Sequence, residues 1–501
     1  MSLAVLYSRA QVGMDAPLVT VEVHLSNGLP SLSIVGLPET AVKESKDRVR
    51  GAILNSHFDF PARRITINLA PADLPKEGGR YDLPIALGIL AASGQIPDND
   101  LQQYEFAGEL ALSGHLRAVQ GILPMALHTK RMQRMLALPL GNAAEAGLIK
   151  DARLVPAQHL LDLTRHLNRT SLIEYTPPAV AAAVDALLPD LSDVRGQHCA
   201  RRALEIAAAG GHSLLMLGPP GTGKSLLASR LPGILPDMTE AEALEAATIT
   251  SISRQRVDTR SWKKRAFRAP HHSASAAALV GGGSNPQPGE ISLAHHGVLF
   301  LDELPEFNRQ VLEVLREPLE SGRIMISRAT RQTEFPALFQ LIAAMNPCPC
   351  GYLGDPSGRC HCSSEQVVRY RNRVSGPLLD RIDMHVEVPR LTFNEMQGAK
   401  GESSAIVRER VTGARTIQLQ RNNTLNSQLT HKQIDKACTL KQSDQILLQR
   451  AMEKLQLSAR AYHRILKLAR TVADLAGSET IKTAHLSEAI GHRKLDRSTS
   501  C

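Results

Sequence analysis

The chain has 501 residues, 43% of them hydrophobic, and a net charge of +9, which suits about three ordinary domains with cores of their own. No apolar run approaches the ~18 residues needed to cross a bilayer, and no basic segment with an apolar core opens the chain, so we expect neither a membrane protein nor a secreted one. Four of the seven cysteines lie between 348 and 362, unlike a disulfide framework, and we expect a cytoplasmic protein.

The first part of the chain, residues 1–172, alternates short apolar runs with turn residues. This pattern predicts an α+β domain. Its expected elements are strands at 19–25, 32–36 and 65–69, helices at 41–56 and 84–92, and a hairpin at 109–117. The Pro- and Ala-rich segment 173–187 is predicted to be a linker.

A phosphate-binding motif follows the linker. The apolar run 213–217 is predicted to be a buried strand and leads into Gly218-Pro219-Pro220-Gly221-Thr222-Gly223-Lys224-Ser225, after which a helix is expected. This is G-x-x-x-x-G-K-S in the strand–loop–helix context that a nucleotide triphosphatase requires. Lys224 is expected to reach the β- and γ-phosphates, and Ser225 to hold Mg²⁺.

Polar residues that complete a hydrolytic site follow two later apolar runs. The run 297–301 ends in Asp302 and Glu303; we expect Asp302 to hold Mg²⁺ and Glu303 to polarise the attacking water. The run 339–345 ends in Asn346, placed to orient that water. Arg381 and Arg460 offer cations that could offset charge on the transferred phosphoryl group.

The last part of the chain, residues 400–501, is predicted to be helical. It contains 18 basic and 9 acidic side chains, an excess equal to the net charge of the whole chain. Such a segment on an ATPase suggests a polyanionic partner such as nucleic acid. A solvated helix face or pairing between subunits would explain the charge equally well.

The order of these elements resembles an AAA+ ATPase, and Val194, Gly196 and Gln197 lie where that family has its adenine-side turn. The stretches 267–273, 279–283 and 288–297 are similar to the magnesium-chelatase-like branch. Three stretches of the first domain narrow the resemblance to the ComM/YifB competence-associated group. They are Ile-Val-Gly-Leu-Pro-Glu (34–39), Asn-Leu-Ala-Pro-Ala-Asp (68–73) and Lys-Glu-Gly-Gly-Arg-Tyr-Asp-Leu-Pro (76–84).

The resemblance implies an α/β fold of three parts, which are an N-terminal Lon-protease-like α+β domain (1–172), an AAA+ P-loop ATPase core (188–395) and a basic helical lid (400–501). It implies that Asn346 is the sensor-1 residue, Arg381 the arginine finger and Arg460 the sensor-2 arginine, with Arg464 as the alternative on the same helix face. Because a finger acts on a neighbouring subunit's nucleotide, it also implies a ring, normally a homo-hexamer. The Lon-like domain lacks the Ser/Lys dyad, because Asp82 and Leu123 occupy the corresponding regions.

Two segments are predicted to contact DNA. The first, from Arg254 to Arg268, interleaves basic residues with the only tryptophan, and bases could stack on the indole. Its DNA-contacting residues are Arg254, Arg256, Arg260, Trp262, Lys263, Lys264 and Arg265. The second is a hairpin at 322–332, with Arg328 and Arg331 near its tip. Pairing at subunit interfaces is the alternative for both.

Cys348, Cys350, Cys360 and Cys362 form a C-x-C-x₉-C-x-C pattern. Four thiolates could close a tetrahedral structural Zn²⁺ site around this glycine-rich segment, although x₂ spacings are more usual than x₁. Reduced free thiols are the alternative, and His361 could replace one cysteine. The pairs His271-His272 and His295-His296 lie inside the family motifs and are not predicted to bind metal.

The favoured function is an ATP-driven hexameric motor that uses ATP and Mg²⁺ to move along single-stranded or branched DNA. Its relatives suggest helicase and branch-migration work in homologous recombination during natural transformation, alongside recombinase-coupled machinery. One alternative is a magnesium-chelatase-type motor subunit that remodels a metal-inserting partner, which capture of a chelatase would favour. Another is an ATP-dependent protein remodeller, which casein turnover would favour.

Overall fold

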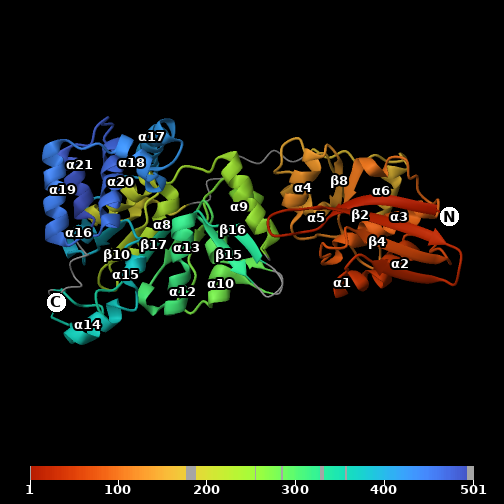
Figure 1. The fold of residues 1–501 in the computed structure, drawn as a ribbon, viewed down its shortest axis with the longest axis horizontal. Coiled ribbons are helices and arrows are strands. Elements are labelled where there is room, and N and C mark those ends of the chain that lie inside the picture. Colours follow the sequence, from red (N-terminus) through yellow and green to blue (C-terminus); the bar gives the residue numbers. More distant parts are fainter. Residues whose placement is uncertain are drawn as a thin grey trace. The chain divides into compact units, whose positions relative to one another are not determined.

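The computed structural model describes residues 2–176, 188–253, 255–283, 286–327, 332–355 and 358–493. The described chain forms two compact units (Figure 1). Residues 2–176 and Leu244–Trp262 make the first, and residues 188–243 and 263–493 make the second. The sequence assigned Leu244–Trp262 to the ATPase core, but its side chains Leu244, Ala247 and Val257 pack into an apolar cluster of the first unit. Most of the predicted linker, 177–187, lies outside the described residues.

The first unit contains a four-stranded sheet in the order β1-β2-β4-β3. Its strands are β1 (Ser2–Arg9), β2 (Leu18–Ser26), β3 (Ser31–Val35) and β4 (Arg64–Ala70). β2 is antiparallel to β1 and β4, whereas β3 runs parallel to β4. Side chains of β2 alternate between buried and partly exposed, as its sequence predicts for a strand with one face on the core.

Helices cover this sheet. α3 (Asp82–Ala92) packs on β1 and β2 and is buried along its whole length. The helix predicted over 41–56 is divided into α1 (Thr40–Lys43) and α2 (Ser45–Asn55). The division falls at Glu44, beside which the Ser45 hydroxyl donates to the carbonyl of Val42 at 2.7 Å.

A second, parallel sheet in this unit has the order β5-β8-β9. Its strands are β5 (Tyr104–Phe106), β8 (Met135–Pro139) and β9 (Leu154–Ala157), with helices α4 (Ile122–Arg131), α5 (Leu140–Ala146) and α6 (Leu160–Leu167). The predicted hairpin is present as β6 (Glu109–Leu110) and β7 (Leu116–Arg117). Short 3₁₀ turns lie at η1 (Gly79–Tyr81), η2 (Leu101–Gln103) and η4 (Thr259–Ser261).

The second unit is built on a five-stranded parallel sheet in the order β11-β14-β17-β10-β18. Its strands are β10 (Leu214–Leu217), β11 (Phe267–Arg268), β14 (Val298–Leu301), β17 (Gln340–Met345) and β18 (Met384–Glu387). β10 lies between β17 and β18, and β14 lies on the other side of β17. The carboxyl ends of these strands therefore meet at one edge, where ligands of open α/β sheets bind.

The second unit also contains helices and two hairpins, and α9 begins in it and ends in the first unit. They are η3 (Leu191–Asp193), α7 (His198–Gly210), α8 (Lys224–Ile234), α9 (Glu240–Ile252, shared with the first unit), α10 (Ala276–Val280), α11 (Glu290–Leu293), η5 (Leu304–Glu306), α12 (Arg309–Val314), α13 (Arg316–Ser321), α14 (Ser364–Arg371) and α15 (Gly376–Leu379), with hairpins β12–β13 (Gly281–Gly282 and Gln287–Pro288) and β15–β16 (Arg323–Ser327 and Gln332–Pro336).

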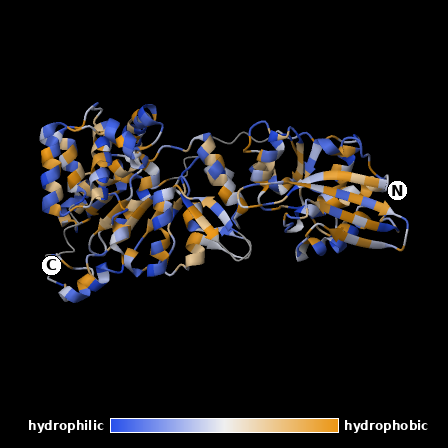
Figure 2. Ribbon diagram, in the orientation of Figure 1, coloured by the Kyte–Doolittle hydropathy of each residue, from blue (hydrophilic) through white to orange (hydrophobic). Residues whose placement is uncertain are grey.

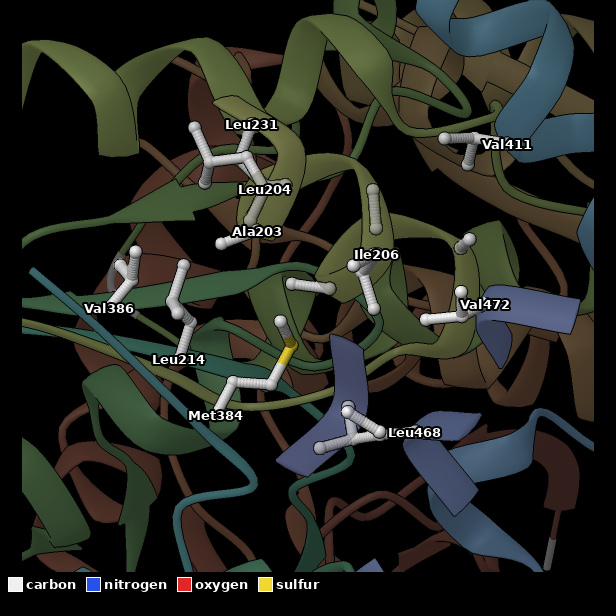
Figure 3. Packing of buried hydrophobic residues seen from close by; sticks show 14 of the residues in the cluster. Ala203, Leu204, Ile206, Leu214, Leu231, Met384, Val386, Val411, Leu468 and Val472 are labelled. Carbon is white, nitrogen blue, oxygen red and sulfur yellow. The ribbon is translucent and has the colours of Figure 1, made fainter. Parts of the chain in front are cut away.

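The C-terminal segment is helical, as predicted. It contains α16 (Phe393–Gln397), α17 (Ser404–Asn422), η6 (Asn426–Gln428), α18 (His431–Ala437), α19 (Gln442–Leu455), α20 (Ala459–Leu475) and α21 (Thr483–Gly491). Its helices share one hydrophobic core with the sheet, in which Val411 and Leu468 belong to the same cluster as Leu214 and Met384 (Figure 3). Apolar residues follow the strands of the sheet, whereas the C-terminal helices carry alternating polar and apolar bands (Figure 2). Among the described helices, none has the length and apolar character to span a membrane.

Candidate active site

The phosphate-binding motif forms the predicted strand–loop–helix. β10 ends at Leu217, the loop follows, and α8 begins at Lys224. Gly221 and Gly223 have φ of 77° and 88°, a left-handed conformation that glycine adopts without strain. The unpaired N–H groups and partial positive charge at the N-terminus of α8 favour an anion at the end of the loop.

Lys224 lies inside the loop with 8% of its surface exposed. Its ammonium group donates to the carbonyls of Gly218 and Pro219 at 2.7 and 2.8 Å and to Oδ1 of Asn346 at 3.1 Å. Burial lowers the pKa of Lys224, and the charges of Asp302 and Glu303 oppose that shift. A partly desolvated cation held only by neutral oxygens is well placed to exchange them for phosphate oxygens.

Ser225 and Asp302 meet at the carboxyl edge of the sheet. Oγ of Ser225 donates to Oδ2 of Asp302 at 2.5 Å, which brings together the two oxygens expected to share Mg²⁺. Hydroxyl and carboxylate oxygens are the donors that this cation uses beside substrate phosphates, so the residues fit it. The bound ion would neutralise charge on the phosphates.

Glu303 follows Asp302 in a left-handed conformation, with φ of 52°. This conformation is uncommon outside glycine. Its carboxylate lies 3.2 Å from Nδ1 of His272, which enters from the segment after β11. The sequence did not predict a role for His272, because its position beside the acidic strand depends on the pairing of β11 with β14.

Asn346 and the adenine-side turn both reach the phosphate loop. Asn346 follows β17 directly and accepts the hydrogen bond from Lys224. Gln197, in a left-handed turn after Gly196, donates to the carbonyl of Pro389 at 2.7 Å and to that of Thr222 at 3.4 Å. Val194 is buried. Gln197 and Asn346 therefore both contact residues of the phosphate loop.

Arg381 is buried in the described chain. It has 7% of its surface exposed, and it donates to the carbonyl of Pro377 at 2.7 Å and to Oε1 of Glu320 at 2.5 Å. A finger must present its guanidinium to a neighbouring subunit, so this role requires Arg381 to leave Glu320. Because the Glu320 side chain is 51% exposed, the pair lies near the surface.

The structure distinguishes Arg460 from Arg464, the two arginines of α20 considered for sensor 2. Arg464 is ion-paired with the buried Asp383. Although burial would raise the pKa of Asp383, Arg464 and then His212 hold it well below its usual range. Arg460, in the first turn of α20, is exposed and has no ion-pair partner in the parts of the chain that the structure describes. Arg460 is therefore the one available to a nucleotide.

The basic segment before β11 is largely neutralised by acidic side chains of the same chain. Three of its cations pair with carboxylates: Arg260 with Asp258 at 3.0 Å, Lys264 with Asp237 at 3.1 Å and Arg265 with Glu242 at 3.3 Å. Trp262 is partly buried and packs against an apolar cluster of the first unit. Arg256 is exposed and Lys263 partly so, whereas Arg254 lies outside the described residues.

The second predicted DNA-contact element is the hairpin β15–β16, which is formed as expected before β17. Arg323 and Glu334 pair across its two strands at 2.9 Å. Its tip, with Arg328 and Arg331, lies outside the described residues.

The four cysteines between β17 and α14 form a cluster. The sulfur atoms of Cys348, Cys350, Cys360 and Cys362 all lie within 4.8 Å of one another. None of the described cysteines forms a disulfide. A hydrogen bond from the N–H of Tyr352 lowers the pKa of Cys350 to about 6. The cluster is compatible with a zinc ion.

The positions of the Lon-type dyad hold non-catalytic side chains. The carboxylate of Asp82 is buried and accepts from Nε of Arg48 at 2.7 Å and from the N–H of Leu110 at 3.2 Å. Leu123 is buried in an apolar cluster. Neither position holds the serine or the lysine of that dyad.

The parallel sheet, the phosphate loop on its central β10, the acidic residues after β14 and the helical C-terminal segment define an AAA+ ATPase core. Three family models match the chain: magnesium chelatase subunit ChlI at residues 190–396, subunit ChlI of Mg-chelatase at 21–142, and the ChlI C-terminal model at 401–493. The chain belongs to the ComM/YifB family of magnesium-chelatase ChlI-like AAA+ ATPases.

Two of its relatives match over nearly the whole length, and a third matches half of the chain. Competence protein ComM of Haemophilus influenzae is 54% identical over 506 residues, which cover 99% of this chain and 98% of the relative. The uncharacterised protein YifB of Escherichia coli is 51% identical over 499 residues, again 99% and 98%. DNA replication licensing factor Mcm2 of Drosophila melanogaster is 28% identical over 266 residues, which cover 50% of this chain and 26% of the relative.

Proposed function

We propose that this protein is an ATP-driven, hexameric DNA motor with helicase and branch-migration activity, acting in homologous recombination during natural transformation. The observation that carries the proposal is the 54% identity, over essentially the full length, to a protein named for competence. The match of half the chain to a DNA replication licensing factor supports work on DNA. Recombinase-coupled machinery would act on the same branched DNA intermediates.

ATP, with Mg²⁺ at Ser225 and Asp302, would bind at the carboxyl edge of the second unit's sheet. Lys224 would contact the β- and γ-phosphates, Glu303 would polarise the attacking water, and Asn346 would orient it. Arg460 would act in the same chain, and Arg381 on the nucleotide of the neighbouring subunit. The proposed DNA contacts are Arg254, Arg256, Arg260, Trp262, Lys263, Lys264 and Arg265 before β11, and Arg328 and Arg331 at the predicted tip of the hairpin β15–β16. To bind phosphates, Arg260, Lys264 and Arg265 would exchange the carboxylates of Asp258, Asp237 and Glu242 for them. The cysteine cluster would bind a structural Zn²⁺.

The decisive experiment measures ATP turnover of the purified protein with no DNA, single-stranded DNA, duplex DNA, and three- and four-stranded branched DNA. Branch migration is followed on the same branched substrates, and the assembly state is measured by mass photometry with and without ATP. We expect branched or single-stranded DNA to stimulate turnover and strand exchange to require ATP. Intact hexamers whose turnover no DNA form changes would rule out the proposal.

A magnesium-chelatase-type motor is the second candidate, because the three matching family models carry the ChlI name. It predicts no response to DNA and stable capture of a metal-inserting partner. The experiment above therefore separates the two functions.

His272 is expected to position the catalytic glutamate. Replacing it by alanine removes the imidazole 3.2 Å from Glu303, so we expect kcat for ATP to fall about 3- to 10-fold, a part of what a general base contributes, with KM unchanged. His272→Asn keeps a side-chain donor and should restore part of the rate. Steady-state kinetics of both variants would check this, and an unchanged kcat in His272→Ala would contradict it.

A further inference from the structure

The cysteine cluster lies in the loop that follows Asn346 of the ATP site. The loop leaves β17 immediately after Asn346, whose side chain binds Lys224, and Cys348 is only two residues further on. It ends at Ser363, which caps α14. At the near end of the loop, Arg371 of α14 donates to the carbonyl of Pro347 at 3.1 Å.

The spacing of the sulfurs fits one tetrahedral ion. Sγ of Cys348 lies 3.3 Å from that of Cys350 and 3.8 Å from that of Cys360, and Cys350 and Cys360 are 3.6 Å apart. A tetrahedron with zinc–sulfur bonds of ~2.3 Å has sulfur–sulfur edges of about 3.8 Å. The N–H of Leu353 donates to Sγ of Cys348 at 3.3 Å, the kind of outer-sphere contact that orients metal ligands.

The turn inside the cluster rests on the phosphate loop. Gly351 follows Cys350 directly and has φ of +84°. A Cβ added there would lie 2.6 Å from Cδ and 3.2 Å from Cγ of Pro220, and 3.8 Å from Cγ of Asn346. The cysteine loop thus touches both the phosphate loop and the sensor asparagine, and Pro220 is a rigid ring that cannot turn away.

We propose that Zn²⁺ bound by Cys348, Cys350, Cys360 and Cys362 holds this loop against Pro220 and Asn346, so that metal occupancy sets the affinity of the site for nucleotide. The segment 347–362 has few buried apolar side chains among its described residues, with Pro347 and Cys348 buried and Leu353 38% exposed. Its other anchors are the ion pair of Asp355 with Arg390 at 2.9 Å and the contact of Arg390 with the Tyr352 ring. These contacts lie between the two cysteine pairs, so the ion would be what fixes the pairs to each other. The inference rests on the ATP site proposed above, but not on the DNA-motor function.

The first test compares the full-length protein with Cys360→Ser/Cys362→Ser, and with Cys199→Ser as the control, since Cys199 is an exposed cysteine of α7 outside the cluster. Zinc content is measured by plasma mass spectrometry under reductant, and the Kd for a fluorescent ATP analogue with Mg²⁺ is measured without DNA. We expect one Zn²⁺ per chain in the wild type and the control. The double variant should lose the ion and bind nucleotide at least about tenfold more weakly.

Two further measurements separate this effect from misfolding. Zinc is removed from the wild type with 1,10-phenanthroline, and adding Zn²⁺ alone should restore nucleotide affinity. Gly351→Ala keeps all four thiols but strains the turn and crowds Pro220, so it should retain zinc and still lose affinity. Circular dichroism and thermal unfolding of each variant report whether the rest of the chain remains folded.

Absence of zinc from freshly purified protein that also binds no added Zn²⁺ would overturn the metal assignment. Metal-free protein with unchanged Kd, or Gly351→Ala with wild-type affinity, would overturn the coupling to the phosphate loop. None of these measurements involves DNA, so a failure of the zinc proposal can be distinguished from a failure of the proposed DNA-motor function.

Discussion

Lys224→Ala is expected to abolish ATP turnover, lowering kcat by at least about 10²- to 10³-fold, the usual cost of removing one charged or polar stabiliser of a transition state. In the structure, the ammonium group is buried and its pKa is lowered by desolvation, with only neutral oxygens in contact with it. Phosphate oxygens of a bound nucleotide would provide the anionic partners that the Lys224 ammonium group lacks. Nothing else in the loop can replace this charge.

The measurement is ATP turnover with and without DNA, together with nucleotide affinity and thermal stability. Lys467→Ala is the matched control, because Lys467 of α20 is a partly buried lysine whose ammonium donates to the carbonyl of Ser427 at 2.9 Å, and burial likewise lowers its pKa. We expect the control to lose stability but keep turnover. Branch migration that survives Lys224→Ala would show that this loop does not drive movement.

Features encoded by adjacent residues could be predicted from the sequence. The phosphate loop is a continuous stretch between an apolar strand and a helix, so its motif defines its shape. Asp302 and Asn346 each follow an apolar run that forms a strand. Neighbouring parallel strands place their carboxyl ends at the same edge of a sheet, so these two residues were expected to lie close together. The predicted strands 19–25 and 65–69 pair with each other as β2 and β4 because each alternates along its length.

Contacts between segments distant in sequence could not be predicted. The contact of His272 with Glu303 and the pairing of Arg381 with Glu320 depend on how loops from different strands meet. The basic segment before β11 looked available to DNA because its acidic partners are elsewhere, with Asp237 and Glu242 more than 20 residues before the cations they bind. The packing of Trp262 could not be predicted for the same reason, since its apolar neighbours belong to the first unit.

Arg381→Ala is expected to lower ATP turnover by about 10³-fold or more while leaving nucleotide binding nearly intact, the signature of an arginine finger. The guanidinium would stabilise charge that develops only in the transition state, so its loss affects kcat rather than affinity. In the described chain it instead binds Glu320. Glu320→Gln, which weakens that pair but keeps the arginine, should retain or raise turnover.

Mixing subunits tests whether Arg381 acts on a neighbour. Lys224→Ala has an intact arginine finger and a defective phosphate loop, whereas Arg381→Ala has an intact phosphate loop and no finger. In a mixed ring, some interfaces therefore join the intact loop of one subunit to the intact finger of its neighbour. We expect a mixture of the two inactive variants to recover a measurable fraction of wild-type turnover, which is followed as the ratio of the two proteins is varied. If the mixture stays inactive although one variant, carrying an affinity tag, co-purifies the untagged other, Arg381 works within its own chain. The ion pair with Glu320 would then be its structural role, and Arg381→Ala and Glu320→Gln should lower thermal stability together.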